Sequence, residues 1–131
     1  MLALQGDFAE HQAALAKVGA GSFQIRTAAE LTLADGLILP GGESTTIAKL
    51  IDSNALREPI REFAKTGKPI WGTCAGLILL ASKVLEQRPD PLGLMDTAVV
   101  RNGFGRQVDS FRTTLAVDTF EGGPLTAVFI R

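Results

Sequence analysis

The sequence contains very little of several residue types that define common protein classes. Its 131 residues include one cysteine, one histidine and no tyrosine. A single cysteine excludes an internal disulfide framework and is typical of proteins in a reducing compartment. We therefore expect a cytoplasmic protein.

The sequence also lacks an excess of positive or negative charge and has no long apolar run. The formal net charge is -1, so no surplus of positive charge favours nucleic acid or a membrane surface. No apolar run reaches membrane-spanning length, and no basic segment followed by an apolar one opens the chain. We expect neither a nucleic-acid nor a membrane partner. What is present, 46% hydrophobic and 21% charged residues, is typical of one globular domain, residues 1–131.

Segments with strand and helix character alternate through residue 85. This alternation predicts an α/β fold with a mostly parallel sheet and flanking helices. The expected strands are 2–5, 22–26, 36–40 and 68–72. The expected helices are one capped by Asp7 that runs to about Val18, one after Ser44 that includes Ile47, Leu50 and Ile51, and the segments 56–65 and 75–85, with a short helical or turn segment over 27–33. The β-like segments 97–101, 110–118 and 127–131 then predict an antiparallel extension of the sheet. Binding sites in parallel sheets lie beyond the carboxyl ends of the strands, where Gln5-Gly6, Gly41-Gly42 and Cys74 are all expected.

The only cysteine lies in Gly72-Thr73-Cys74-Ala75-Gly76, between a strand-like and a helix-like run. Small residues around a cysteine at such a junction are typical of a nucleophile elbow, a tight turn that presents the side chain at the mouth of a cleft. The dipole of the following helix favours the nucleophilic thiolate, and the N–H of Ala75 is placed to bind an oxyanion. The alternative is that Cys74 is a small buried core residue.

A second motif, Pro40-Gly41-Gly42-Glu43-Ser44, follows a buried strand. Its glycines let the backbone approach a ligand, and its N–H groups, that of Gly42 among them, would complete an oxyanion hole with Ala75. The alternative is a plain strand-to-helix turn with Ser44 as the N-cap.

Two further positions are open on the residues alone. Arg101, at the start of a polar glycine-rich stretch, would either bind a substrate carboxylate or lie in a solvated hairpin turn. His11 is the only histidine available to activate a cysteine. We place it on the polar side of the first helix, one turn after Asp7, as a surface or first-turn residue.

These motifs together resemble the glutaminase subunit of pyridoxal 5′-phosphate synthase, a class I, triad-type glutamine amidotransferase. The resemblance runs nearly from end to end and implies a flavodoxin-like fold without cofactor or metal. It is carried by Leu2-Ala3-Leu4-Gln5-Gly6-Asp7, the segment 35–46, Gly72-Thr73-Cys74-Ala75-Gly76-Leu77-Ile78, Arg101-Asn102, the segment 104–111 and Val128-Phe129-Ile130-Arg131.

The resemblance also implies roles for single residues. Cys74 would attack the side-chain amide of L-glutamine, and the substrate would be held by Gly42, Glu43, Ser44, Arg101, Ile130 and Arg131. The product ammonia would pass to a separate synthase subunit, a (β/α)₈ barrel, for vitamin B6 biosynthesis in a hetero-oligomeric complex.

The family carries its catalytic histidine and glutamate in a His-Pro-Glu sequence beyond the Phe-Ile-Arg run, and these 131 residues contain no such sequence. We therefore expect a C-terminally truncated chain that has little glutaminase activity alone, although Cys74 would still react with an alkylating reagent. Two alternatives remain open. One is a non-catalytic subunit that only binds the synthase. The other is a small cysteine hydrolase or chaperone of the PfpI type, against which the Gly41-Gly42-Glu43-Ser44 loop and the segment 101–107 argue.

Overall fold

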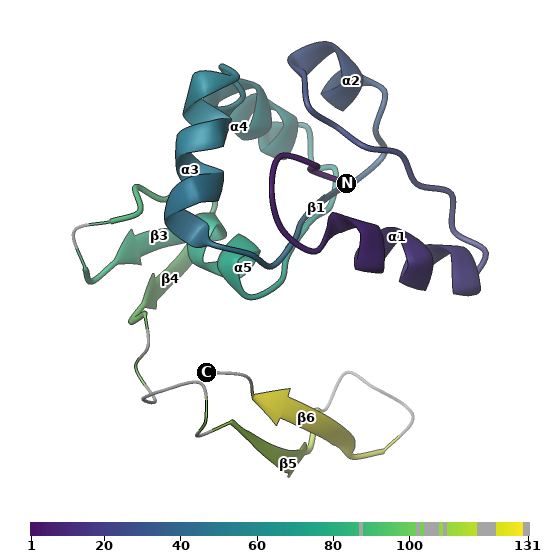
Figure 1. The fold of residues 1–131 in the computed structure, drawn as a ribbon, viewed down its shortest axis with the longest axis vertical. Coiled ribbons are helices and arrows are strands. Elements are labelled where there is room, and N and C mark those ends of the chain that lie inside the picture. The colour runs from purple at the N-terminus through teal and green to yellow at the C-terminus, as the bar shows by residue number, and fades with distance from the viewer. Residues whose placement is uncertain (87, 102, 104–107, 109, 118–122, 130–131) are drawn as a thin grey trace. The chain divides into compact units, whose positions relative to one another are not determined.

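The computed structural model describes residues 1–86, 88–101, 103, 108, 110–117 and 123–129 (Figure 1). The chain divides into two compact units, Met1–Arg101 and Asn102–Arg131, and each is described by itself. That residues 1–131 form a single domain stays a prediction.

Parallel strands form the centre of the first unit. Strands β1 (Leu37–Leu39) and β2 (Ile70–Gly72) pair in parallel with Ile38 opposite Trp71. Leu2 donates its N–H to Ile38 O at 2.9 Å and forms a parallel bridge with Ile25 on its other side. The spatial order is therefore second, first, third and fourth strand, the order of flavodoxin-like sheets. This confirms the predicted α/β fold, although the first two strands are reduced to one bridge.

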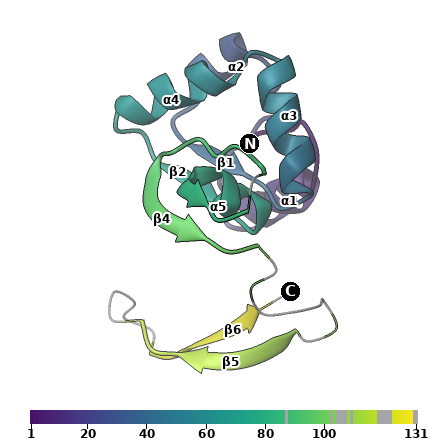
Figure 2. The ribbon, with the colours of Figure 1, turned by 90° about the vertical axis from the view of Figure 1, so that its left-hand side faces the viewer.

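Helices pack around this sheet, and α3 and α4 each bury one face. Ile47 and Ile51 of α3 and Ile60 of α4 are at most 1% exposed, at the spacing expected of an amphipathic helix. Helix α5 packs against both β1 and β2, and α3 packs against α5, as the turned view helps to follow (Figure 2). None of the helices within the described ranges is long and apolar enough to cross a membrane. The helices are α1 (Phe8–Lys17), α2 (Ala28–Thr32), α3 (Ser44–Ser53), α4 (Arg57–Lys65) and α5 (Ala75–Leu80).

The end of the first unit differs from the prediction. The helix expected over 75–85 ends at Leu80, and β3 (Ala81–Val84) pairs in parallel, not antiparallel, with β4 (Met95–Val99). The carbonyl oxygens of Leu79, Leu80 and Ala81 accept hydrogen bonds from the N–H groups of residues 92–94. A returning segment therefore takes acceptors that a longer helix would need.

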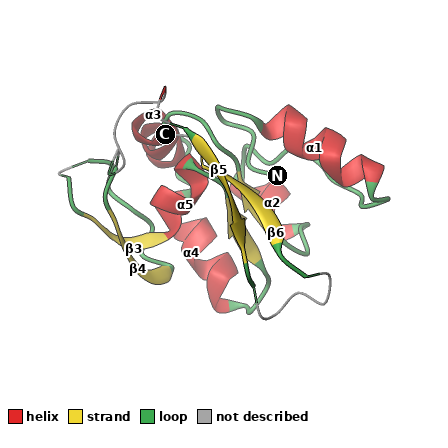
Figure 3. Cartoon of the chain, turned by 90° about the horizontal axis from the view of Figure 1, so that it is seen from below, coloured by secondary structure: helices red, strands yellow, loops and turns green. Residues whose placement is uncertain are grey.

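The second unit contains one antiparallel pair, β5 (Phe111–Leu115) and β6 (Leu125–Phe129), drawn in yellow in Figure 3. Phe111 lies opposite Phe129, and the two rings stack with their centroids 4.8 Å apart. The antiparallel pairing agrees with the prediction. That these strands extend the parallel sheet stays a prediction.

Candidate active site

Cys74 lies on the turn between β2 and α5, as predicted, and its side chain is exposed. Its backbone has φ +49° and ψ -109°, a conformation that L-residues rarely adopt. Bonds on both sides fix the turn, because Thr73 N–H donates to Leu39 O at 3.1 Å and Gly76 N–H to Thr73 O at 2.8 Å. The alternative of a small buried core cysteine is therefore wrong.

Steric exclusion explains the glycines that flank this turn. A Cβ on Gly76 would lie 2.0 Å from Leu39 O, and one on Gly72 would lie 2.5 Å from the carbonyl carbon of Gly76. Neither position has room for any side chain. Ala75 is the first residue of α5, so its N–H has no acceptor within the helix.

The loop after β1 lies against this turn. A Cβ on Gly41 would lie 3.5 Å from the Cβ of Cys74, and Gly41 O accepts a 3.0 Å bond from Asp7 N–H. Gly42 has φ +152°, and the space of its missing side chain is taken by Gln5 Oε1. Gln5 Oε1 also accepts the N–H of Glu43 at 3.0 Å. The three strand ends therefore converge at one edge of the sheet, as expected.

Glu43 is the N-cap of α3, and Ser44 is its first, buried residue. The alternative that made Ser44 the N-cap is therefore wrong by one residue. The carboxylate of Glu43 accepts hydrogen bonds from the N–H groups of Thr45 and Thr46 and from the Thr46 hydroxyl, at 2.6–3.0 Å. The Thr46 hydroxyl, aided by the two N–H groups, lowers the pKa of Glu43 to about 2. Glu43 is thus charged at neutral pH.

Arg101 reaches the same place from 58 residues further along the chain. Its Nη2 lies 3.5 Å from Glu43 Oε1, and its Nη1 donates to Arg88 O at 3.0 Å. Only 27% of the side chain is exposed. The guanidinium thus lies beside the α3 N-terminus and is partly buried. That Arg101 binds a substrate carboxylate stays a prediction. Ile130 and Arg131, the remaining predicted binding residues, lie outside the described residues.

His11 is the residue whose position sequence reasoning missed. Its Nε2 hydrogen-bonds to the Thr73 hydroxyl at 2.8 Å, and its ring meets Trp71 edge-on with centroids 5.7 Å apart. It therefore lies on the inner side of α1, not on the polar side. The signal was present in the spacing, because Phe8, His11 and Leu15 share one helix face and all three are half-buried.

A hollow of about 310 Å³ opens in the first unit, but Cys74 does not line it. Its lining includes Met1, Leu15, Phe23 and Trp71. Among the described residues, no group of three His, Cys, Asp or Glu side chains lies close enough to hold a metal ion. The reactive geometry therefore rests on the cysteine turn and the two loops beside it.

Comparison with known proteins agrees with this arrangement. The chain is 53% identical to the pyridoxal 5'-phosphate synthase subunit PdxT of Frankia alni and 51% identical to that of Salinispora arenicola, over 100% of its own length. It spans about two thirds of these relatives, 67% and 66% of their lengths. A solved structure described as a glutamine amidotransferase superposes with a TM-score of 0.88 and 42% identity, over 98% of this chain and 68% of that one.

The model of the SNO glutamine amidotransferase family matches residues 1–131. This match agrees with the parallel strand order, the cysteine on a strained strand-to-helix turn and the glycine loop beside it. The chain therefore belongs to the SNO glutamine amidotransferase family.

Proposed function

We propose that this chain carries the glutaminase half of a pyridoxal 5′-phosphate synthase, which hydrolyses L-glutamine to L-glutamate and ammonia. The observation that carries the proposal is the exposed Cys74 at φ +49° with the Gly41 backbone against it. A nucleophile raised from a tight turn beside a second backbone loop is what acyl transfer requires.

In this proposal the Cys74 thiolate attacks the carbonyl carbon of the glutamine side-chain amide. The carbonyl oxygen becomes an oxyanion, which the N–H groups of Gly42 and Ala75 would stabilise. The C–N bond then breaks, and the nitrogen leaves as ammonia after it takes up a proton. Water hydrolyses the remaining thioester to glutamate and returns the thiol. The group that moves these protons is not assigned to any described residue.

Substrate binding is assigned to the surroundings of the α3 N-terminus. The guanidinium of Arg101 would pair with the α-carboxylate of glutamine, as a charge-assisted hydrogen bond. Glu43 holds this guanidinium from one side through the 3.5 Å contact. Gly42 and Ser44 would contact the substrate through the loop backbone. Ile130 and Arg131 would complete the site, as the family resemblance implies.

The partner is proposed from the relatives, which are named as subunits of pyridoxal 5'-phosphate synthase. A glutaminase needs an acceptor for its ammonia, so we propose that a synthase subunit with a (β/α)₈ barrel receives it. The single cysteine is compatible with the cytoplasm as the place of this complex.

A second candidate is a subunit that binds the synthase but does not hydrolyse glutamine. It is favoured by one observation: the Nε2 of His11 is bonded to the Thr73 hydroxyl. A histidine held in this way is not placed as the base of a cysteine triad.

The test compares wild-type protein with Cys74→Ala and Cys74→Ser, each mixed with the synthase subunit. We expect glutamate formation only from wild type, with synthase binding retained by all three in calorimetry. Turnover by Cys74→Ala would remove Cys74 as the nucleophile. Tight synthase binding without any turnover by wild type would favour the second candidate.

A further inference from the structure

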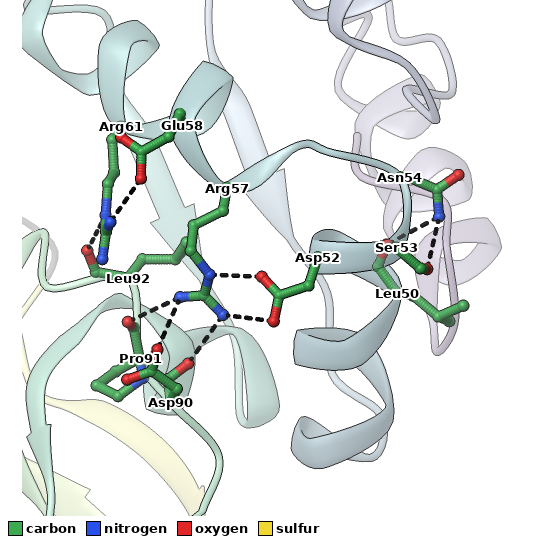
Figure 4. Close-up of polar contacts among 10 residues, drawn as sticks. All are labelled: Leu50, Asp52, Ser53, Asn54, Arg57, Glu58, Arg61, Asp90, Pro91 and Leu92. Atoms are coloured by element: carbon green, nitrogen blue, oxygen red, sulfur yellow. Dashed lines mark hydrogen bonds and ion pairs between the residues drawn. The ribbon is translucent and has the colours of Figure 1, made fainter.

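Arg57, on the first turn of α4, has no role in the proposed reaction, yet its guanidinium makes four hydrogen bonds. Its Nε and Nη2 bind both carboxylate oxygens of Asp52 at 2.5 and 3.2 Å (Figure 4). Nη1 donates to Pro91 O at 3.0 Å, and Nη2 also donates to Asp90 O at 3.3 Å. The Arg57 side chain is only 16% exposed. A single guanidinium therefore joins the C-terminal turn of α3 to the segment of residues 88–92.

The two elements that Arg57 joins are the two that hold Arg101. The N-cap of helix α3 is Glu43, whose Oε1 lies 3.5 Å from Arg101 Nη2. The 88–92 segment supplies the other acceptor, Arg88 O, at 3.0 Å from Arg101 Nη1. The distance between Glu43 Oε1 and Arg88 O therefore stays the same only if α3 and the 88–92 segment do not move relative to each other.

Only short stretches of chain separate the Arg57 contacts from the groups that hold Arg101. Asp52 lies nine residues after Glu43 along α3, about 14 Å at the rise of a helix. Helix α3 contains no proline or glycine at which it would kink, so a displacement of one end is carried to the other. On the other side, Asp90 and Arg88 are two residues apart. A shift at Arg57 would therefore change the distance between Glu43 and Arg88 O.

We propose that Arg57 is a positioning residue for substrate recognition, which fixes the spacing of the two groups that orient Arg101. This inference rests on the proposed function, because it assigns Arg101 to the carboxylate of glutamine. Arg57 itself touches no substrate. Its effect is on how well Arg101 is pre-oriented, and binding geometry of this kind is sensitive to shifts of about 1 Å.

A neighbouring arginine supplies the matched control. Arg61 also comes from α4 and also donates to a carbonyl of the same segment, Leu92 O at 3.0 Å. Its other partner is Glu58 of its own helix, at 2.7 Å. Arg61 thus holds the segment but does not tie it to α3. If joining the two elements is what matters, only Arg57 affects substrate binding.

The experiment measures KM and kcat for glutamine in the full gene product with the synthase subunit present. For Arg57→Ala we expect KM to rise about three- to tenfold with kcat nearly unchanged, in the range of couplings through packed elements. Arg57→Lys keeps the positive charge but cannot bind both oxygens of Asp52, so its KM should lie between those of wild type and Arg57→Ala. Arg61→Ala should leave KM within about twofold of wild type by the same reasoning. Equal KM effects of Arg57→Ala and Arg61→Ala would overturn the proposal.

A double-mutant cycle with Arg101→Ala separates positioning from general loosening. If Arg57 acts through Arg101, Arg57→Ala adds no further rise in KM once Arg101 is gone, whereas additive effects would contradict the proposal. Asp52→Asn replaces Arg57→Ala if the latter does not fold, with the same expected direction. Alkylation of Cys74 by iodoacetamide, which has no α-carboxylate, should be equal in all variants. A wild type without turnover would instead refute the proposed function.

Discussion

The cysteine turn and the Arg101–Glu43 contact lie in the same unit but are held in place by different forces. At the turn, backbone atoms approach so closely that a Cβ on Gly76 would lie 2.0 Å from Leu39 O. At the contact, the guanidinium and the carboxylate are 3.5 Å apart, and 52% of the Glu43 side chain is exposed. The cysteine turn is therefore fixed by steric exclusion, and the Arg101–Glu43 contact by the attraction of two side-chain charges near water.

This difference predicts how each region responds to change. Steric exclusion acts at all pH values and salt concentrations, and a single added methyl group breaks it. Contacts between exposed charges contribute little to stability and depend on salt, but they can decide how a charged substrate is bound. The turn should therefore control folding and chemistry together, whereas the Arg101–Glu43 contact should control substrate binding with little effect on folding.

The largest effect is expected from Gly76→Ala, which tests the steric side of the comparison. The added Cβ must displace the β1 backbone at Leu39, so we expect a loss of at least about 3 kcal/mol in the free energy of unfolding. Urea unfolding checks this. Gly21→Ala is the control, because a Cβ there has nothing within 4 Å and needs no positive φ. Equal stability of the two variants would show that the turn is not sterically fixed.

Arg101→Ala tests the charged side. Loss of a charge-assisted hydrogen bond to the α-carboxylate should weaken glutamine binding by about 1.5–3 kcal/mol, while unfolding changes little. The measurement is KM in the presence of the synthase subunit, together with the urea midpoint. An unchanged KM would return Arg101 to the role of a solvated turn residue, and a large loss of stability would erase the contrast with Gly76.

His11→Ala tests a contact between these extremes. The Thr73 hydroxyl loses one partner at 2.8 Å, so we expect a destabilisation of about 0.5–1.5 kcal/mol, the net contribution of a typical hydrogen bond. Glutamine turnover should fall less than about tenfold, because a general base contributes 10²–10⁴ and His11 is not assigned that role. A loss of turnover by a factor of about 100 or more would make His11 the base after all.

The smallest effect is expected from Glu43→Gln and has a defined pH window. The folded protein lowers the pKa of Glu43 from 4.5 to about 2, so its contribution is complete above pH 4.5 and is lost as the pH falls toward 2. Because the side chain is half exposed, we expect less than about 1 kcal/mol. Unfolding of wild type and Glu43→Gln between pH 2 and 6 should converge at the acid end. A difference that persists at pH 2 would contradict the assignment.

The same contrast explains how much could be predicted from the sequence. The parallel sheet follows from the alternation of strand and helix segments. The position of Cys74 and the close approach of the Gly41 loop follow from glycine patterns, because these report steric constraints directly. The length of α5 could not be predicted, since residues 92–94 remove its acceptors from a distance. The orientation of His11 required its spacing from Phe8 and Leu15 to be weighed above its polarity. The Arg57 contacts depend on carbonyl positions that no motif encodes.

The positive φ of Cys74 affects which residue is most stable at this position of the turn. A residue with φ +49° is strained by about 1–3 kcal/mol unless it is glycine, so Cys74→Gly should make the folded state more stable while it removes the sulfur. At this position the fold and the proposed chemistry favour different residues. Selection for stability alone would favour glycine here, so the strained cysteine supports the proposal that Cys74 is the nucleophile.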